Sequence, residues 1–152
     1  MDLNKNGYSI DVGKAVQKAL VHDLEESQSG DIIRTFKYRN PELKAAVDDA
    51  SEAALKDIIE ADFPDFAAEV LDLWRDSKDS SIEGRIVAFS DLLTVISFCD
   101  EQIKLGNRYM LPIQHRALGY LRDGFGSYKT SDGKKPFASY MRELKRFELE
   151  NS

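Results

Sequence analysis

The sequence has few of the residues that interrupt helices or cross-link secreted proteins. Among its 152 residues there are nine glycines, four prolines and one cysteine, Cys99. A lone cysteine cannot form an internal disulfide, which fits a reducing compartment. No run approaches the roughly 20 apolar residues of a membrane span, and the N-terminal residues lack both the basic and the apolar region of a signal peptide. We therefore expect a cytoplasmic protein without a membrane segment.

Positive charge is also scarce. The chain has 21 Lys and Arg residues against 27 Asp and Glu residues, so its formal net charge is −6. A protein that coats nucleic acid by releasing counterions from phosphates needs a surplus of basic residues. We therefore expect no nucleic-acid partner, and any phosphate that the protein handles should be small.

The apolar residues recur at spacings of three and four, which is typical of helices. They make up 42% of the chain, enough for one sizeable core. The pattern predicts an all-α fold, with residues 1–152 in a single domain. Asn40 before Pro41 and the pair Ser80-Ser81 before Ile82 predict two helix starts. We expect helices over residues 11–26, 41–58, 65–76, 82–105, 113–121 and 136–148.

Polar residues interrupt the apolar face that we expect to be buried on the first helix, formed by Val12, Ala15, Val16, Ala19 and Leu20. The next inward positions are His22 and Asp23, and Glu26 lies on the same edge of the helix. Neighbouring carboxylates that lose their hydration need a cation nearby. A divalent metal held by imidazole and carboxylate would supply it. The alternative is a hydrogen-bonded core histidine beside the solvated acidic end of a helix.

Asp91 interrupts the apolar stripe of the helix expected over residues 82–105. Four residues that share its helix face are apolar, so we expect its carboxylate to be buried. A buried carboxylate needs a basic or metallic partner. Arg85 is the only cation nearby in sequence, and it lies on a different face of the helix. Metal ligation and a salt bridge are therefore both open. The apolar neighbours are Val87, Ala88, Val95 and Phe98.

These motifs together resemble those of a known family. The segment KALVHDLEESQSGDI is similar to the second-helix signature of HD-domain phosphohydrolases, in the branch of bacterial and phage 5′-deoxynucleotidases. Asp91 falls where that branch has a distal metal-binding aspartate. The resemblance covers roughly residues 12–110. It implies an HD-domain helical bundle that hydrolyses a small-molecule nucleotide, a deoxynucleoside 5′-monophosphate, to nucleoside and phosphate.

The resemblance also implies a role for each matching residue. His22, Asp23 and Asp91 would bind one divalent transition metal, either Mn, Co, Ni or Zn. Glu26 would be the acid/base carboxylate, and Asp31 its partner near the attacking water or the phosphate.

Several lysines are candidates for binding an anion. Lys37 follows the Gly-Asp turn, where the family has a comparable basic position, and it could reach a phosphate. The alternative is an ordinary solvated lysine. Lys129, Lys134 and Lys135 in the segment SYKTSDGKKP could guide an anionic ligand, or they could simply be solvated.

The sequence departs from the family's pattern near its N-terminus. The family has a further histidine on the helix before the HD motif, and none of the eleven residues before Val12 is histidine. We expect either an N-terminally incomplete protein, which lacks the first His-bearing helix, or a diverged paralogue, and in both cases weak hydrolysis. His115 is expected to be a helix-surface or packing residue and not a replacement ligand. Two other functions are left open: a non-catalytic module that binds a nucleotide or a partner, and a dNTP triphosphohydrolase. A homodimer is also left open.

Overall fold

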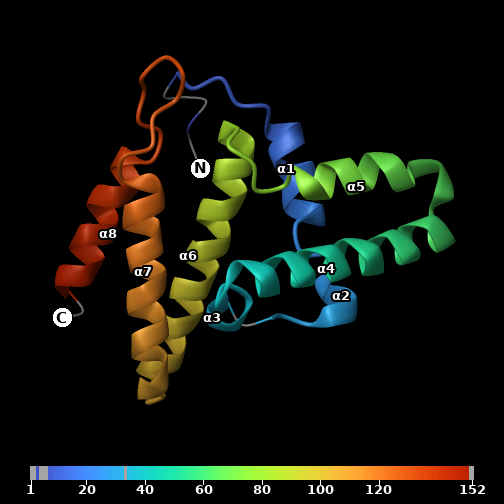
Figure 1. Cartoon of the computed structure of the whole chain (residues 1–152). Coiled ribbons are helices and arrows are strands. Elements are labelled where there is room, and N and C mark those ends of the chain that lie inside the picture. Colours follow the sequence, from blue (N-terminus) through green and yellow to red (C-terminus); the bar gives the residue numbers. More distant parts are fainter. Residues whose placement is uncertain (1–2, 4–6, 33, 151–152) are drawn as a thin grey trace. The chain divides into compact units, whose positions relative to one another are not determined.

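The structure, a computed structural model, describes residue 3, residues 7–32 and residues 34–150 (Figure 1). Every regular element in these ranges is a helix, which confirms the all-α prediction. The chain divides into two compact units. Val12–Gly84 forms one, here called the α1–α5 unit, and Met1–Asp11 together with Arg85–Ser152 forms the other, the α6–α8 unit. None of the described helices has the length and apolar character that crossing a membrane requires.

The α1–α5 unit contains α1 (Val12–Val21), α2 (Glu26–Ser29), α3 (Arg34–Lys37), α4 (Pro41–Asp62), η2 (Pro64–Phe66) and α5 (Ala67–Arg75). The start of α4 is as predicted, because the Asn40 side chain accepts a hydrogen bond of 2.7 Å from the backbone N–H of Leu43. Helices α4 and α5 run side by side (Figure 1) and share an apolar core. Its buried residues are Leu55, Ile59, Ala67 and Leu71, with Val70 and Trp74 packed against them.

The predicted extent of the first helix, residues 11–26, is wrong at its C-terminal end. Helix α1 ends at Val21, and α2 begins only at Glu26. The residues between them form turns in which the N–H of Leu24 donates to Val21 O and that of Glu26 donates to Asp23 O. Carboxylates are unfavourable at the negative C-terminal end of a helix and favourable in a first turn. The acidic run at residues 23–26 therefore ends one helix and begins the next.

The predicted buried face of α1 is also wrong. Val12, Val16 and Leu20 have exposed fractions of 58%, 52% and 72%, whereas Lys18 and Val21 are buried. Positions two residues apart on a helix point in nearly opposite directions. Once Lys18 faces inward, Val16 and Leu20 must face outward.

Lys18 is buried because polar groups of the segment 76–81 surround its ammonium group. Its Nζ lies 2.6 Å from the Asp76 carbonyl oxygen, 2.8 Å from Asp79 Oδ1 and 3.2 Å from Ser81 Oγ. A lysine ammonium has three N–H donors, so these three acceptors satisfy it fully. The lysine thereby ties α1 to the segment that joins α5 to the next helix.

The α6–α8 unit contains most of α6 (Ile82–Lys104), together with η3 (Arg108–Met110), α7 (Leu111–Phe125) and α8 (Ala138–Glu150). Ser81 caps α6, because its Oγ accepts a hydrogen bond of 3.1 Å from the N–H of Gly84. The unit has an apolar core in which aromatic rings pack edge to face. Cys99 is buried, and its thiol is free. The buried core residues are Phe89, Ile96, Ala117, Leu118, Leu121, Phe125 and Phe137.

Asp91 is only half-buried, so the prediction of a buried carboxylate is wrong. Of its expected apolar neighbours, Val87 is buried, whereas Val95 and Phe98 are exposed. The face of α6 that carries Asp91 is therefore buried towards the start of the helix and exposed beyond Asp91.

Candidate metal centre

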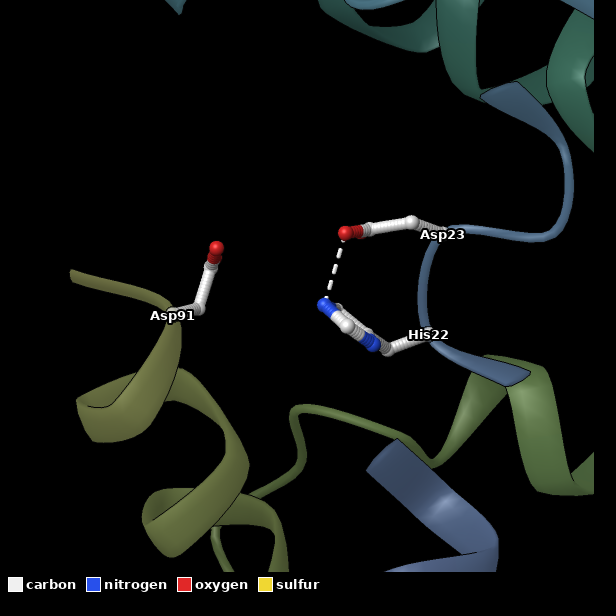
Figure 2. Close-up of side chains that lie close together, drawn as sticks. All are labelled: His22, Asp23 and Asp91. Carbon is white, nitrogen blue, oxygen red and sulfur yellow. Dashed lines mark ion pairs between the residues drawn. The ribbon is translucent and has the colours of Figure 1, made fainter. Parts of the chain in front are cut away.

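His22 and Asp23 lie in the turn that follows α1 and form an ion pair (Figure 2). His22 Nε2 is 2.6 Å from Asp23 Oδ2, and His22 Nδ1 is 2.7 Å from the carbonyl oxygen of Ala19. A carbonyl oxygen can only accept, so Nδ1 carries a proton and donates it. This second contact fixes the ring and leaves Nε2 as the nitrogen that can bind a metal.

The pairing changes the ionisation of both side chains. The hydrogen bond with Asp23 raises the pKa of His22, and this effect outweighs the opposing effect of partial burial. Burial by itself would raise the pKa of Asp23, but the hydrogen bonds and positive charges of His22 and Lys78 lower it. The Asp23 carboxylate therefore stays negative more readily than usual, and the His22 imidazole beside it is protonated more readily than usual.

Lys78 is a neighbour of this pair that the sequence analysis missed. Its Nζ lies 3.4 Å from Asp23 Oδ1, on the side of the carboxylate not used by His22. The lysine belongs to the segment between α5 and α6, and 55 residues separate it from Asp23. No local pattern in the sequence could have signalled a contact over that separation.

Glu26 is the first residue of α2 and is half-buried in an acidic cluster. Burial raises its pKa, and the negative charges of Asp23, Asp31 and Glu25 raise it further. Asp31 is exposed and follows Gly30, whose φ of 64° suits a glycine at the end of α2. The structure thus places the two predicted acid/base carboxylates in the same acidic cluster as Asp23.

Glu25, which also belongs to this cluster, is hydrogen-bonded to the only tryptophan. Trp74 Nε1 donates a hydrogen bond of 2.7 Å to Glu25 Oε2, which links the turn after α1 to α5. Together with the Lys18 contacts, this bond fixes the turn that carries His22 and Asp23 at both of its ends.

Lys37 lies at the end of α3 and pairs with a carboxylate of α4. Its Nζ is 2.9 Å from Asp48 Oδ1, and Lys44 binds the other oxygen of the same carboxylate. The hydrogen bonds from Lys44 and Lys37 outweigh the effect of burial and lower the pKa of Asp48. The predicted phosphate-binding lysine is therefore engaged in an ion pair within its own unit.

Asp91 comes from α6 and is the third side chain drawn in Figure 2. Arg85, the cation nearest to it in sequence, instead donates to the carbonyl oxygen of Gly124 and lies 4.5 Å from the centre of the Phe125 ring. His115 is exposed on α7, as expected. Of the loop lysines, Lys134 pairs with Asp132 at 2.9 Å.

The donor chemistry of His22, Asp23 and Asp91 fits a divalent transition metal. The three residues offer one imidazole nitrogen and two carboxylate oxygens, which are donor types that such a metal binds. The carbonyl of Ala19, which orients the imidazole, is a support typical of histidines that bind metals.

In a comparison with known protein families, residues 2–124 match a family model described as 5′-deoxynucleotidase YfbR-like. This range contains all six residues that the sequence analysis proposed for the site. No curated protein and no solved structure matches the chain.

Proposed function

The chain belongs to the YfbR-like 5′-deoxynucleotidase family of the HD superfamily, and from this premise we propose that it hydrolyses deoxynucleoside 5′-monophosphates to nucleoside and phosphate. The match over residues 2–124 is the observation that carries the proposal. Membership of an HD-type family also implies a divalent metal.

The proposed ligands are His22, Asp23 and Asp91. His22 would bind through Nε2, since Nδ1 is committed to the Ala19 carbonyl. A bound divalent cation would neutralise phosphate charge and lower the pKa of a coordinated water. Three protein ligands leave coordination positions for water and for a phosphate oxygen.

Glu26 is the proposed acid/base residue, with Asp31 as its partner. A carboxylate that takes a proton from the attacking water must not itself be saturated by a strong ion pair. The raised pKa of Glu26, caused by burial and then by its acidic neighbours, makes it a better proton acceptor than an ordinary glutamate. Asp31, which is exposed, would orient the water or the departing proton.

Lys37 stays a candidate for contacting the phosphate. Its ammonium group would first have to leave Asp48, with which it pairs at 2.9 Å. Lys44 also binds Asp48, so the carboxylate would keep one cation if Lys37 moved.

The test combines metal binding with phosphate release. We expect Mn²⁺ or Co²⁺ to raise the melting temperature of the chain, and phosphate to be released from deoxynucleoside monophosphates faster than from ribonucleotides or dNTPs. Asp91→Asn should abolish the metal-dependent rise and lower hydrolysis at least about 100-fold, because loss of a ligand should cost more than loss of a supporting group. Preference for a dNTP would instead favour a triphosphohydrolase.

The matched control is Asp100→Asn. Asp100 lies on the same helix as Asp91 and pairs with Lys104 at 2.6 Å. The substitution removes the same charge from α6 without touching a proposed ligand, so metal binding and hydrolysis should not change. An unchanged metal effect in Asp91→Asn would remove Asp91 from the ligand set. Metal and nucleotide binding without any hydrolysis would favour a non-catalytic binding module.

A further inference from the structure

The segment Asp76–Ser81 is held by a buried cation from α1. The Lys18 ammonium group binds three of its acceptors, the Asp76 carbonyl, the Asp79 carboxylate and the Ser81 hydroxyl. The segment is also turned on itself, because the N–H of Ser77 donates to Trp74 O and that of Asp79 to Asp76 O. Its position relative to α1 is therefore set by directional bonds within the α1–α5 unit.

Lys78 projects from this fixed segment back to the end of α1. Lys18 lies in the last turn of α1, and His22, four residues later, directly follows the end of the helix. Lys78 spans the remaining distance and places its Nζ 3.4 Å from Asp23 Oδ1. Its side chain is 36% exposed, so the ammonium group is accessible to a small solute.

The acidic surroundings of the site would favour a cation such as the Lys78 ammonium group when a phosphate binds. Asp23, Glu25 and Asp31 place negative charge around Glu26, and a phosphate dianion that approached these carboxylates would be repelled. Lys37 is occupied by Asp48. When Asp23 binds a metal, the metal neutralises its carboxylate, and the ammonium group beside it gains by contacting another anion.

We propose that Lys78 binds the phosphate of the substrate, at a position set by the Lys18 anchor. The inference rests on the proposed function, since that reaction brings a phosphate to the metal. An ammonium group binds phosphate as a compact point charge. Lys78 leaves Asp23 for the phosphate only when both metal and substrate are present.

The experiment measures two affinities by calorimetry at one pH. Mn²⁺ is titrated into the chain first, and inorganic phosphate is then titrated into the Mn²⁺-loaded chain. In Lys78→Met we expect phosphate to bind about 10-fold to 100-fold more weakly, as for loss of a charged hydrogen bond. Mn²⁺ should bind as tightly as before or more tightly, because a like charge beside it has gone. Lys78→Arg should keep most of the phosphate affinity.

Lys56→Met is the charge-matched control. Lys56 lies on α4, is more than half exposed and makes a long contact of 3.7 Å with Glu60. The substitution removes one positive charge from the same unit. If phosphate binding weakened only because the unit lost a positive charge, Lys56→Met would show the same loss. We expect its Mn²⁺ and phosphate affinities to equal those of the unsubstituted chain.

The outcomes separate the two proposals. Equal phosphate affinities in Lys78→Met and Lys56→Met, with Mn²⁺ still bound, would overturn the role of Lys78 and leave the proposed function standing. Weaker Mn²⁺ binding in Lys78→Met would also overturn it, since Lys78 would then serve only to position Asp23. Absence of Mn²⁺ binding in the unsubstituted chain would overturn the proposed function and this inference with it.

Discussion

The two units bury different kinds of groups. In the α6–α8 unit the core is aromatic, and the Phe89 ring lies 4.8 Å from that of Phe137 and 5.1 Å from that of Phe125. In the α1–α5 unit the inward face of α1 buries Lys18, which is 0% exposed and held by three polar contacts. Apolar burial depends on area, whereas a buried charge depends on the number and direction of its partners. The candidate site is built on the second kind of burial.

Phe89→Ala should have the largest effect on stability. The side chain is 1% exposed and contacts three rings, those of Phe125, Phe137 and Tyr140. Removing it leaves a cavity in the core, and we expect the free energy of unfolding to fall by about 3–5 kcal/mol, as measured by urea denaturation.

Leu105→Ala is the control for this substitution. Leu105 is 80% exposed, so its loss should change the unfolding free energy by less than about 0.5 kcal/mol. A loss of under about 1 kcal/mol in Phe89→Ala would mean that the aromatic core can close around the missing ring, and the contrast between the units would weaken.

Lys18→Met should have the next largest effect, about 2 kcal/mol. Methionine fills much of the same volume but removes the ammonium donor from the Asp76 carbonyl and from the Asp79 carboxylate, which keeps only its hydrogen bonds from Ser81. Asp79 is 33% exposed and can regain water, so the cost is smaller than for a fully buried ion pair. The same variant should weaken phosphate binding to the Mn²⁺-loaded chain, because the segment carrying Lys78 loses its anchor.

Lys14→Met, one turn earlier on α1, is the matched variant at an exposed position. We expect its unfolding free energy to stay within about 0.5 kcal/mol of the unsubstituted chain. If both lysine variants lost the same stability, the buried contacts of Lys18 would contribute nothing beyond ordinary surface charge.

The local signals in the sequence predict much of the fold and part of the site. The caps at Asn40 and Ser81 depend on residues three positions away, so the starts of α4 and α6 can be predicted from the pattern. Likewise, His22 and Asp23 are adjacent, and their pairing follows from the motif itself.

Contacts between distant segments escape the sequence analysis. Lys18 contacts residues that are 58 and 63 positions away in the sequence, and Lys78 contacts Asp23 over a separation of 55 residues. Both lysines therefore look like ordinary solvated residues in the sequence. The orientation of α1 depends on Lys18, and this explains why its apolar residues were assigned to the wrong face. Hydrophobic periodicity cannot identify a helix face whose inward position is held by a charge.

Trp74→Phe tests a single polar contact in the α1–α5 unit. Phenylalanine keeps most of the packing against the α4–α5 core but cannot donate to Glu25, which Trp74 contacts at 2.7 Å. We expect a loss of about 1 kcal/mol in unfolding free energy, the usual net value of one hydrogen bond. Glu25→Gln keeps an acceptor oxygen for the indole N–H and should lose less. Equal losses in both variants would show that the charge of Glu25, and not the hydrogen bond, is what matters.

The smallest effect concerns the pH dependence of stability at Asp79. Burial by itself would raise the pKa of Asp79, but hydrogen bonds from Lys18 and Ser81 lower it below its ordinary value of 3.8. A carboxylate with a lowered pKa in the folded state stabilises the protein above its ordinary pKa, and this contribution disappears as the pH falls through the lower, folded-state value. Urea denaturation of the unsubstituted chain and of Asp79→Asn should therefore show a difference in unfolding free energy that is constant near neutral pH and shrinks below about pH 4. Solvent screens a side chain that is one-third exposed, so the change should be modest. A difference that stays the same down to pH 3 would show that the Lys18 anchor does not depend on the charge of Asp79, and that its two other acceptors suffice to bury the lysine.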